Sequence, residues 1–320
     1  MYHPDSTTSL TGRDAGPPRA GATKGAALAE VSLLLAVFFV GMDVVSVKYA
    51  LEGLPPLVFM PFRYVLAGLL LLAFLRLLGW NAGGGLGRGD LLALAGLGVV
   101  GIAINYVGYT VGLSLTSGSN AALIIATAPV WGLVLGIVLG LERGTWMGAL
   151  GLGLAIAGVA LVVGESLESE GASVGGDLLV CVSALSWGAY TVLSLPVLRR
   201  VAPLAVGAWT MLLGGLAALP LAFTGFPGLS ASISSVQWGS VGTPAWAAAA
   251  YSTVLCSSFA IAAYQANVAR RGANKVLVYL YLQTLVGLLA SVALLGEGLR
   301  EAKVAGAAVI LLGVYLARRA

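Results

Sequence analysis

Residues 28–77 read LAEVSLLLAVFFVGMDVVSVKYALEGLPPLVFMPFRYVLAGLLLLAFLRL, two long apolar runs joined by a short turn that contains Pro55 and Pro56. A helix that rises about 1.5 Å per residue needs about 20 residues to cross a hydrocarbon core about 30 Å thick, and each run has that length. The runs do not alternate apolar and polar residues as the strands of a membrane barrel do. This stretch therefore predicts two successive helices that span a membrane.

The rest of the chain continues in the same way. Of its 320 residues, 59% are apolar and 9% are charged, whereas about a quarter of the residues in soluble domains are charged. We therefore expect an all-α membrane protein of about ten transmembrane helices with mostly short connections. The expected spans are 28–48, 56–77, 91–112, 118–140, 145–163, 178–197, 203–223, 246–268, 275–295 and 302–318.

Two polar segments fall outside these spans. Residues 1–25 are rich in Gly, Pro, Ser, Thr and Ala and cannot bury enough apolar surface to order themselves, so we expect a disordered cytoplasmic tail. Residues 164–177 carry four acidic side chains and are expected to form an external linker. The first apolar run is too long for a signal-peptide core and has no convincing cleavage site, so we interpret it as a span.

Basic residues are distributed unevenly across the predicted membrane. If the amino terminus is cytoplasmic, 13 of the 17 Lys and Arg residues lie in the two tails and the cytoplasmic loops, which predicts that both termini are cytoplasmic. The net charge of +4 then reflects topology, and we expect no nucleic-acid partner because no basic stripe with interleaved aromatic residues is present. The 13 residues are Arg13, Arg19, Lys24, Arg76, Arg88, Arg143, Arg199, Arg200, Arg270, Arg271, Lys275, Arg318 and Arg319.

The two halves of the chain, 26–163 and 178–318, resemble each other. Pro56 and Gly68 recur 147 residues later, and Glu142, Gly151 and Gly158 recur 155 residues later, as Pro203, Gly215, Glu297, Gly306 and Gly313. Each half holds five expected spans, and an odd number forces the second half to enter the membrane upside down. Inverted repeats are typical of secondary transporters, because exchanging the conformations of the halves exposes one site to alternate sides.

Several motifs occur in the order found in one family of transporters. They are Val40-Gly41-Met42-Asp43, Lys48-Tyr49-Ala50-Leu51-Glu52-Gly53-Leu54-Pro55-Pro56, Phe62-Arg63-Tyr64, Ala128-Pro129-Val130, Gly158-Val159, Gly176-Asp177-Leu178-Leu179, Ala184-Leu185-Ser186-Trp187-Gly188-Ala189-Tyr190-Thr191 and Leu295-Gly296-Glu297. In this order, over residues 28 to 318, the chain resembles EamA-type transporters of the drug/metabolite transporter superfamily.

The resemblance implies ten helices in a bacterial plasma membrane and the export or exchange of amino acids, other metabolites or drugs through a central cavity. Two positions depart from the family's pattern. Asp43 stands where an uncharged polar residue is frequent, and Thr284 stands where a proline would match Pro129. Since a proline removes one backbone hydrogen bond and can kink a helix, we expect the ninth helix to be straighter than the fourth.

Polar side chains inside the spans are the candidates for binding a solute, because an ionised group near the bilayer centre costs at least about 2.5–3.5 kcal/mol unless it is paired or hydrated. Asp43 and Arg63 lie at similar depths on successive antiparallel helices and could pair. Asp43 is expected to face a cavity and to take part in transport. The alternative, a permanent pair that only fixes packing, stays open. The full set of candidates is Asp43, Arg63, Asn105, Tyr109, Trp187, Tyr190 and Gln283.

Spans 145–163 and 302–318 hold few polar groups, so we expect both at the edge of the bundle. Enzyme functions are disfavoured because the single histidine, His3, lies in the tail, and the string Gly96–Gly101 lies within a span and not after a strand. We expect no cofactor and no metal.

The expected partners are a small-molecule solute, the lipid bilayer and, as an open option, a second copy in a homodimer. Two alternatives to a metabolite transporter remain. They are a carrier or flippase for nucleotide- or lipid-linked sugars and a non-transporting membrane scaffold.

Overall fold

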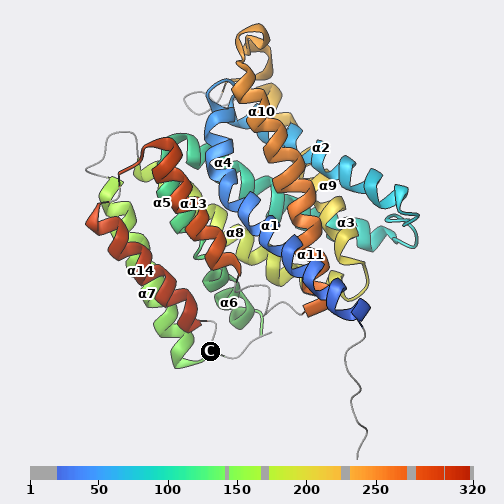
Figure 1. Cartoon of the computed structure of the whole chain (residues 1–320), viewed down its shortest axis with the longest axis horizontal. Coiled ribbons are helices and arrows are strands. Elements are labelled where there is room, and N and C mark those ends of the chain that lie inside the picture. The colour runs from blue at the N-terminus through green and yellow to red at the C-terminus, as the bar shows by residue number, and fades with distance from the viewer. Residues whose placement is uncertain are drawn as a thin grey trace, which may run out of the picture.

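The computed structural model describes residues 20–140, 144–166, 173–224, 231–271, 279–298 and 300–317. All regular secondary structure in these ranges is helical (Figure 1). The α-helices are α1 (Ala20–Leu51), α2 (Pro56–Leu77), α3 (Arg88–Gly98), α4 (Asn105–Leu115), α5 (Gly118–Ile125), α6 (Ala128–Val138), α7 (Trp146–Ser166), α8 (Val174–Leu198), α9 (Pro203–Thr224), α10 (Thr243–Tyr251), α11 (Ala260–Arg271), α13 (Tyr279–Leu295) and α14 (Glu301–Ala317). Two π-helical turns, η1 (Val99–Ile104) and η4 (Ser252–Phe259), and two 3₁₀ turns, η2 (Ile233–Ser235) and η3 (Trp238–Ser240), complete the set.

Over the described ranges these elements make ten crossings. α3, η1 and α4 follow one another without a break and form one crossing, as do α10, η4 and α11, and α5 and α6 together form another. Eight crossings are long and apolar enough to span a membrane, and α13 contains a shorter apolar stretch, Leu282–Leu295. The predicted fold, two five-helix repeats in an all-α membrane protein, is confirmed.

The first helix begins earlier than the sequence predicts. α1 starts at Ala20, so residues 20–25, which the composition assigned to a disordered tail, are helical. The segment from Ala20 to Glu30 is rich in alanine, the best helix former, and contains no proline. The helix therefore extends backwards from the apolar run. Residues 1–19 and 167–172, most of the predicted tail and the middle of the acidic linker, lie outside the described residues.

Helices of the first repeat pack against helices of the second repeat. α2 packs on α9, and α7 packs on α14. α1 packs on α10, η4 and α11 in the same way as α8, its counterpart in the second repeat, packs on η1 and α4. α7 and α14 lie side by side at one edge of the molecule (Figure 1), which confirms the expectation from their lack of polar residues.

Small residues hold this edge pair together. A Cβ placed on Gly151 would lie 2.6 Å from the carbonyl oxygen of Gly313, and one on Gly158 would lie 2.9 Å from that of Gly306. Glycine at these positions lets the two backbones approach closely. In the sequence alignment of the repeats, Gly151 matches Gly306 and Gly158 matches Gly313. In the structure Gly151 instead contacts Gly313 and Gly158 contacts Gly306, as expected of two equivalent helices that run in opposite directions.

The equivalent helices share unusual features. η1 and η4 lie at corresponding places in the third and eighth crossings. Gly140 and Gly296, which follow α6 and α13, have φ angles of 69° and 68° and end their helices in the left-handed conformation that glycine adopts without strain. The fourth crossing is broken between α5 and α6 just before Pro129, whereas α13 runs unbroken through Thr284, as the sequence predicts.

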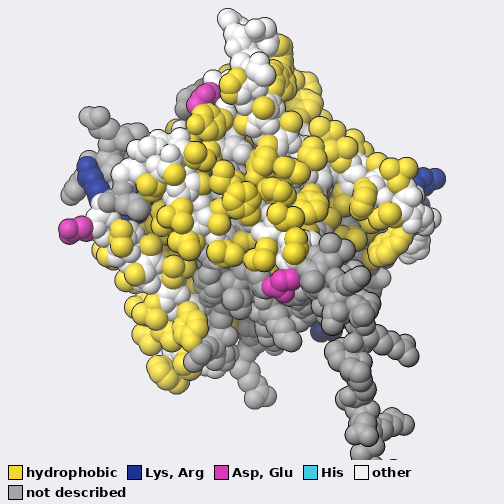
Figure 2. All heavy atoms as spheres, in the orientation of Figure 1, with side chains coloured by type: hydrophobic (Ala, Val, Ile, Leu, Met, Phe, Trp, Pro, Cys, Tyr) yellow, Lys and Arg dark blue, Asp and Glu magenta, His cyan; other side chains and the backbone are white. Residues whose placement is uncertain are grey.

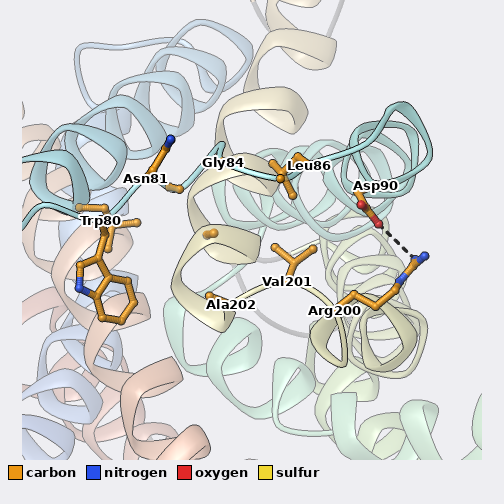
Figure 3. Close-up of a pocket in the computed structure, with 12 residues that line it drawn as sticks. Trp80, Asn81, Gly84, Leu86, Asp90, Arg200, Val201 and Ala202 are labelled. Atoms are coloured by element: carbon orange, nitrogen blue, oxygen red, sulfur yellow. Dashed lines mark ion pairs between the residues drawn. The ribbon is translucent and has the colours of Figure 1, made fainter.

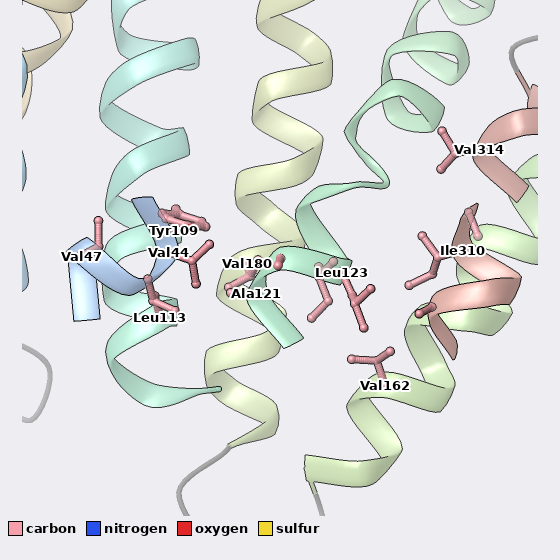
Figure 4. Packing of buried hydrophobic residues seen from close by; sticks show 14 of the residues in the cluster. Val44, Val47, Tyr109, Leu113, Ala121, Leu123, Val162, Val180, Ile310 and Val314 are labelled. Carbon is pink, nitrogen blue, oxygen red and sulfur yellow. The ribbon is translucent and has the colours of Figure 1, made fainter. Parts of the chain in front are cut away.

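The surface and the core fit a bilayer environment. Hydrophobic side chains cover most of the described surface in Figure 2, and only a few charged side chains interrupt them. The largest buried cluster joins both repeats, with Val44 and Val47 from α1, Tyr109 and Leu113 from α4, Ala121 and Leu123 from α5, Val162 from α7, Val180 from α8, and Ile310 and Val314 from α14 (Figure 4).

Candidate functional site

Asp43 on α1 and Arg63 on α2 form a buried ion pair. The Arg63 Nη2 and Asp43 Oδ2 atoms are 2.6 Å apart. Asp43 is 7% exposed and Arg63 is 5% exposed. Asp43 lies eight residues before the end of α1 and Arg63 seven after the start of α2, which places both about 10–12 Å below the same end of the bundle. The predicted pairing is confirmed. Asp43 is buried in this conformation, and its predicted role in facing a transport cavity stays a prediction.

The second repeat supplies the remaining partners of the pair. Ser252 donates its hydroxyl hydrogen to Asp43 Oδ1, and Ser257 accepts a hydrogen bond of 2.9 Å from Arg63 Nε. Both serines belong to the π-helical turn η4. A π turn inserts an extra residue into a helix and changes which side chains face a neighbour, and such turns are frequent at functional sites. The pair is therefore shared by helices of both repeats.

Aromatic rings extend from this pair through the middle of the bundle. The Arg63 guanidinium lies 5.1 Å from the centre of the Tyr64 ring, and Tyr64 lies 4.2 Å from Tyr106. Tyr106 is 6.3 Å from Trp187, and Trp187 is 5.1 Å from Tyr190. We call these four residues, Tyr64, Tyr106, Trp187 and Tyr190, the aromatic line. Tyr106 and Trp187, in the middle of this line, are only half-buried.

The far end of the aromatic line is the counterpart of the ion pair. Tyr190 and Thr210 stand 147 residues after Asp43 and Arg63, the offset that relates the two repeats. Their hydroxyl oxygens are 3.3 Å apart in a buried hydrogen bond. The contact between the first two helices thus holds a charged pair in the first repeat and a neutral pair in the second. The two repeats are therefore similar in fold, but only the first has charged side chains at this position.

The other predicted site residues lie around this axis. Asn105 donates to the backbone oxygen and the hydroxyl of Ser183 at 2.7 and 3.0 Å, which ties the third crossing to α8. Tyr109 is buried and lies 6.5 Å from Tyr106. Gln283 is half-buried on α13, and its backbone carbonyl oxygen lies close to Gly41 of α1. The structure brings Asp43, Arg63, Trp187 and Tyr190 onto one line and places Tyr109 beside it, whereas Asn105 bonds to α8 and Gln283 lies on α13.

Two carboxylates, those of the half-buried Glu297 and the buried Asp177, join the repeats at the end of the bundle where α1 ends and α2 begins, here called the Glu52 end. Glu297 accepts the backbone amides of Gly118 and Ser119 at 2.6 and 2.8 Å. Asp177 accepts the Thr116 hydroxyl at 2.6 Å and the Asn120 amide at 3.3 Å. Each carboxylate belongs to the second repeat and each partner to the first, so these bonds close the Glu52 end.

The opposite end, where α8 ends and α9 begins, contains a cavity and is called the Arg200 end. The cavity has a volume of about 230 Å³. It lies between the turn that links α2 to α3 and the turn that links α8 to α9, and Trp80, Asn81, Gly84 and Leu86 stand opposite Val201 and Ala202 (Figure 3). Asp90 and Arg200 form an ion pair of 3.5 Å at its edge (Figure 3).

Residues that line the cavity also pack with part of the aromatic line in one hydrophobic cluster. Ala82, Leu86, Val201 and Ala205 line the cavity, and all four pack in the cluster that contains Tyr190 and Trp187. Trp209 donates its indole N–H to the Ala82 carbonyl at 3.0 Å, which holds the turn after α2 against α9. A line of contacts therefore runs from the Asp43–Arg63 pair to the cavity.

The sequence profile of the EamA-like transporter family matches this chain twice, over residues 27–164 and 174–319. The chain belongs to the EamA-like transporter family. The two matched regions are the two packed repeats, and the protein is a multi-pass membrane transporter, not an enzyme. Its partners therefore include a small-molecule substrate and the lipid bilayer.

Individual relatives of this EamA protein match between 72% and 90% of its length. It is 26% identical over 90% of its length to an uncharacterized transporter of Archaeoglobus fulgidus, 98% of which is covered. It is 24% identical over 88% of its length to a probable amino-acid metabolite efflux pump of Salmonella typhimurium, 92% of which is covered, and 29% identical over 72% to a probable terminal-alkyne amino-acid exporter of Streptantibioticus cattleyicolor, 74% of which is covered.

A solved crystal structure resembles the fold of this EamA protein. The two superpose with a TM-score of 0.63 and 17% sequence identity, and the match covers 91% of this chain and 96% of the other. At that identity the likeness concerns the fold alone. Within the described part of the chain, no group of three or more His, Cys, Asp and Glu side chains could hold a metal ion.

Sequence reasoning missed four contributors to the site of this EamA protein. Tyr64 and Tyr106 complete the aromatic line, and Ser252 and Ser257 complete the ion pair. Tyr64 is adjacent to Arg63, and three serines lie within residues 252–258, so the residue types were visible. Their roles depend on how each helix is rotated about its own axis. The π turns change this rotation, and no local sequence pattern predicts by how much.

Proposed function

We propose that this EamA transporter is a secondary transporter that exports or exchanges small organic metabolites by alternating access. Its site comprises the Asp43–Arg63 pair and the aromatic line, with Asn105, Tyr109 and Gln283 beside them. We place the protein in a bacterial plasma membrane with the Arg200 end and both termini in the cytoplasm, because basic residues concentrate at that end.

The one-sided ion pair is the observation that carries this proposal. A charged pair kept in the membrane interior at 7% and 5% exposure is costly to maintain. Intramembrane ionisable groups are therefore functional candidates by default. Here the pair adjoins the buried ring of Tyr64, and the half-buried rings of Tyr106 and Trp187 beyond it suit an amphipathic solute. The named activities of the relatives from Salmonella typhimurium and Streptantibioticus cattleyicolor support an amino-acid-related solute.

The arrangement of the repeats supports alternating access. The Glu52 end is closed by carboxylates that bridge the repeats, whereas the Arg200 end holds a cavity. When equivalent helices of the two repeats exchange conformations, the Glu52 end opens and the Arg200 end closes. The site between them then meets the cytoplasm and the outside in turn.

Solute exchange in proteoliposomes tests the proposal. Vesicles with the purified protein are loaded with unlabelled amino acids, other metabolites or drugs, and uptake of the labelled compound is measured between pH 5 and 8. We expect exchange by the parent and at least a tenfold loss in a folded Asp43→Asn variant. Ser46→Ala is the matched control, because the Ser46 hydroxyl bonds to the Met42 carbonyl of its own helix and to no other residue among those the structure describes.

Each outcome has a defined meaning. Absence of exchange by folded, vesicle-inserted parent for every compound of the panel contradicts the proposal of a secondary transporter. Exchange by Asp43→Asn at the parent rate across the pH range contradicts only the role of Asp43, and the pair is then a packing element.

A further inference from the structure

The buried ion pair and the π turn η4 form one closed ring of hydrogen bonds. Arg63 donates from Nη2 to Asp43 Oδ2 at 2.6 Å and from Nε to the Ser257 hydroxyl at 2.9 Å. The Ser257 hydroxyl donates in turn to the backbone carbonyl of Ser252 at 3.2 Å, and the Ser252 hydroxyl donates to Asp43 Oδ1. We call these four buried residues the ion-pair ring. The ring ties η4 of the second repeat to α1 and α2 of the first.

The ion-pair ring depends on the π conformation of η4. Ser252 and Ser257 are five residues apart, and in an α-helix two such side chains point about 140° away from each other. Bonds from residue i to residue i+5 in a π turn bring them to the same side. The backbone of η4 has this spacing at its end, where the Ala260 amide donates to the Leu255 carbonyl. An α-helical η4 would therefore turn one serine away from the ion pair and open the ring.

The corresponding place in the first repeat lacks the two serines. The residues that precede them by 155 positions are Leu97 and Ile102, both apolar and buried. The turn η1, which contains Ile102, packs on α8 and α9, the helices that carry the neutral pair of Tyr190 and Thr210. Serines thus accompany the charged pair and apolar residues the neutral pair, so the link between a π turn and an ion pair is special to η4.

The register of η4 sets the orientation of α11. α11 follows η4 directly and packs on α1 and α9. Asn267 on α11 donates to the Ser32 hydroxyl at 3.3 Å, and Ser32 lies about 28 Å along α1 from its end at Leu51. α11 therefore forms part of the bundle on the side of the Arg200 end. One residue gained or lost in a helix turns the part beyond it by about 100°, so a change of register in η4 rotates α11 against α1.

We propose that Ser252 and Ser257 are positioning residues that couple the ion pair to α11. A solute that binds Asp43 or Arg63 takes the hydrogen bonds of the ion-pair ring, η4 then adopts the α-helical register, and α11 turns at the Arg200 end. The π form is the rarer helix, so η4 keeps it only while the ring supplies the extra bonds. The inference rests on the proposed transport function and adds the hinge of the movement and the event that triggers it.

The rate of disulfide formation between engineered cysteines reports the orientation of α11. The background carries Cys181→Ala and Cys256→Ser, which keeps a donor for the carbonyl that the Cys256 thiol contacts. Ser32→Cys with Asn267→Cys places thiols on two residues that share a hydrogen bond across α1 and α11. We call this the α11 reporter, and rotation of α11 separates its two thiols.

A second pair of cysteines reports the part of the same crossing that precedes η4. A Cβ on Gly53 would lie 3.4 Å from the Cβ of Ala245 in α10, close to the separation of about 3.5–4.5 Å found in disulfides. Gly53→Cys with Ala245→Cys is therefore the α10 reporter. The proposed rotation leaves its rate within about twofold.

Serine variants open the ion-pair ring without removing a charge. In folded protein, Ser252→Ala and Ser257→Ala should each slow the α11 reporter at least tenfold. Ser258→Ala is the matched control, because the Ser258 hydroxyl also bonds a backbone carbonyl five residues earlier, that of Thr253 at 3.2 Å, but makes no bond to the ion pair among the described residues. Unchanged rates in the two ring variants, equal slowing by Ser258→Ala, or equal slowing of both reporters each overturn the inference.

Exchange in proteoliposomes tests the trigger and the need for rotation. A saturating concentration of a compound that the protein exchanges should slow the α11 reporter at least tenfold. A formed α11 disulfide should lower exchange of that compound at least tenfold, and reduction with dithiothreitol should restore it. Exchange at the reduced rate with the disulfide formed overturns the inference while the transport function stands. If the reduced protein exchanges no compound of the panel, the proposed function and the solute as trigger fail together, and the serine variants then decide separately whether the ring holds η4.

Discussion

The Asp43–Arg63 pair allows a quantitative prediction about stability. Asp43→Asn keeps the shape of the side chain and its ability to accept the Ser252 hydroxyl, but it removes the charge that faces Arg63. A guanidinium stays protonated under all accessible conditions, so the variant leaves a buried cation without an anion. Breaking a buried pair from one side costs about 3–5 kcal/mol. Arg63 retains Ser257 and the rings of Phe59 and Tyr64, so we expect about 3 kcal/mol, at the lower end of that range.

The double variant should recover much of this loss. Asp43→Asn with Arg63→Gln leaves two neutral amides in the site, so we expect it to be at least about 1–2 kcal/mol more stable than the sum of the two single changes. The counterpart pair in the second repeat gives the control. Tyr190→Phe removes only the neutral hydrogen bond to Thr210 and should cost about 0.6 kcal/mol, the average for such bonds in membranes.

Unfolding of the purified protein in detergent or bicelles, followed by circular dichroism as denaturant is added, measures these four free energies. Strictly additive losses in the double variant would mean that the two charges do not interact in the folded protein, and the interpretation of the site as a coupled pair would be wrong. A loss for Tyr190→Phe equal to that for Asp43→Asn would refute the claim that the two symmetric positions differ electrostatically.

Three further predictions concern packing, closure and orientation. Gly158→Leu should lower stability by about 1–3 kcal/mol through overpacking, because a Cβ there would lie 2.7 Å from an Ile310 side-chain carbon, whereas Gly153→Leu, with nothing within 4 Å, should have no effect on the melting temperature. Glu297→Ala removes an acceptor of the first amides of α5, so hydrogen exchange at those amides should accelerate at least tenfold, and unchanged protection would contradict a closing role. In a variant without the native cysteines, an impermeant thiol reagent should label a cysteine at position 168 from outside but not one at position 199, and the reverse labelling would invert the proposed topology.

The candidate site could be predicted in part. Asp43 and Arg63 were identifiable because a charge within an apolar run is rare, and their pairing followed from counting residues from a shared turn. The break at Pro129 and the unbroken α13 at Thr284 followed equally from local chemistry. Tyr106, Ser252 and Ser257 were not identifiable as partners, because each is a common residue type whose significance depends on what it faces.

The sequence by itself determined the number of crossings, the duplication and the two intramembrane charges that could pair, because lipid tolerates few polar groups and a helix has a constant rise per residue. Only the tertiary structure decided how each helix is rotated. The π turns η1 and η4 changed which side chains face the neighbouring repeat, and this rotation turned Ser252 and Ser257 toward the ion pair. The cavity beside Asp90 and Arg200 likewise arises where two turns far apart in the sequence meet, a contact that depends on long-range packing and not on any local pattern.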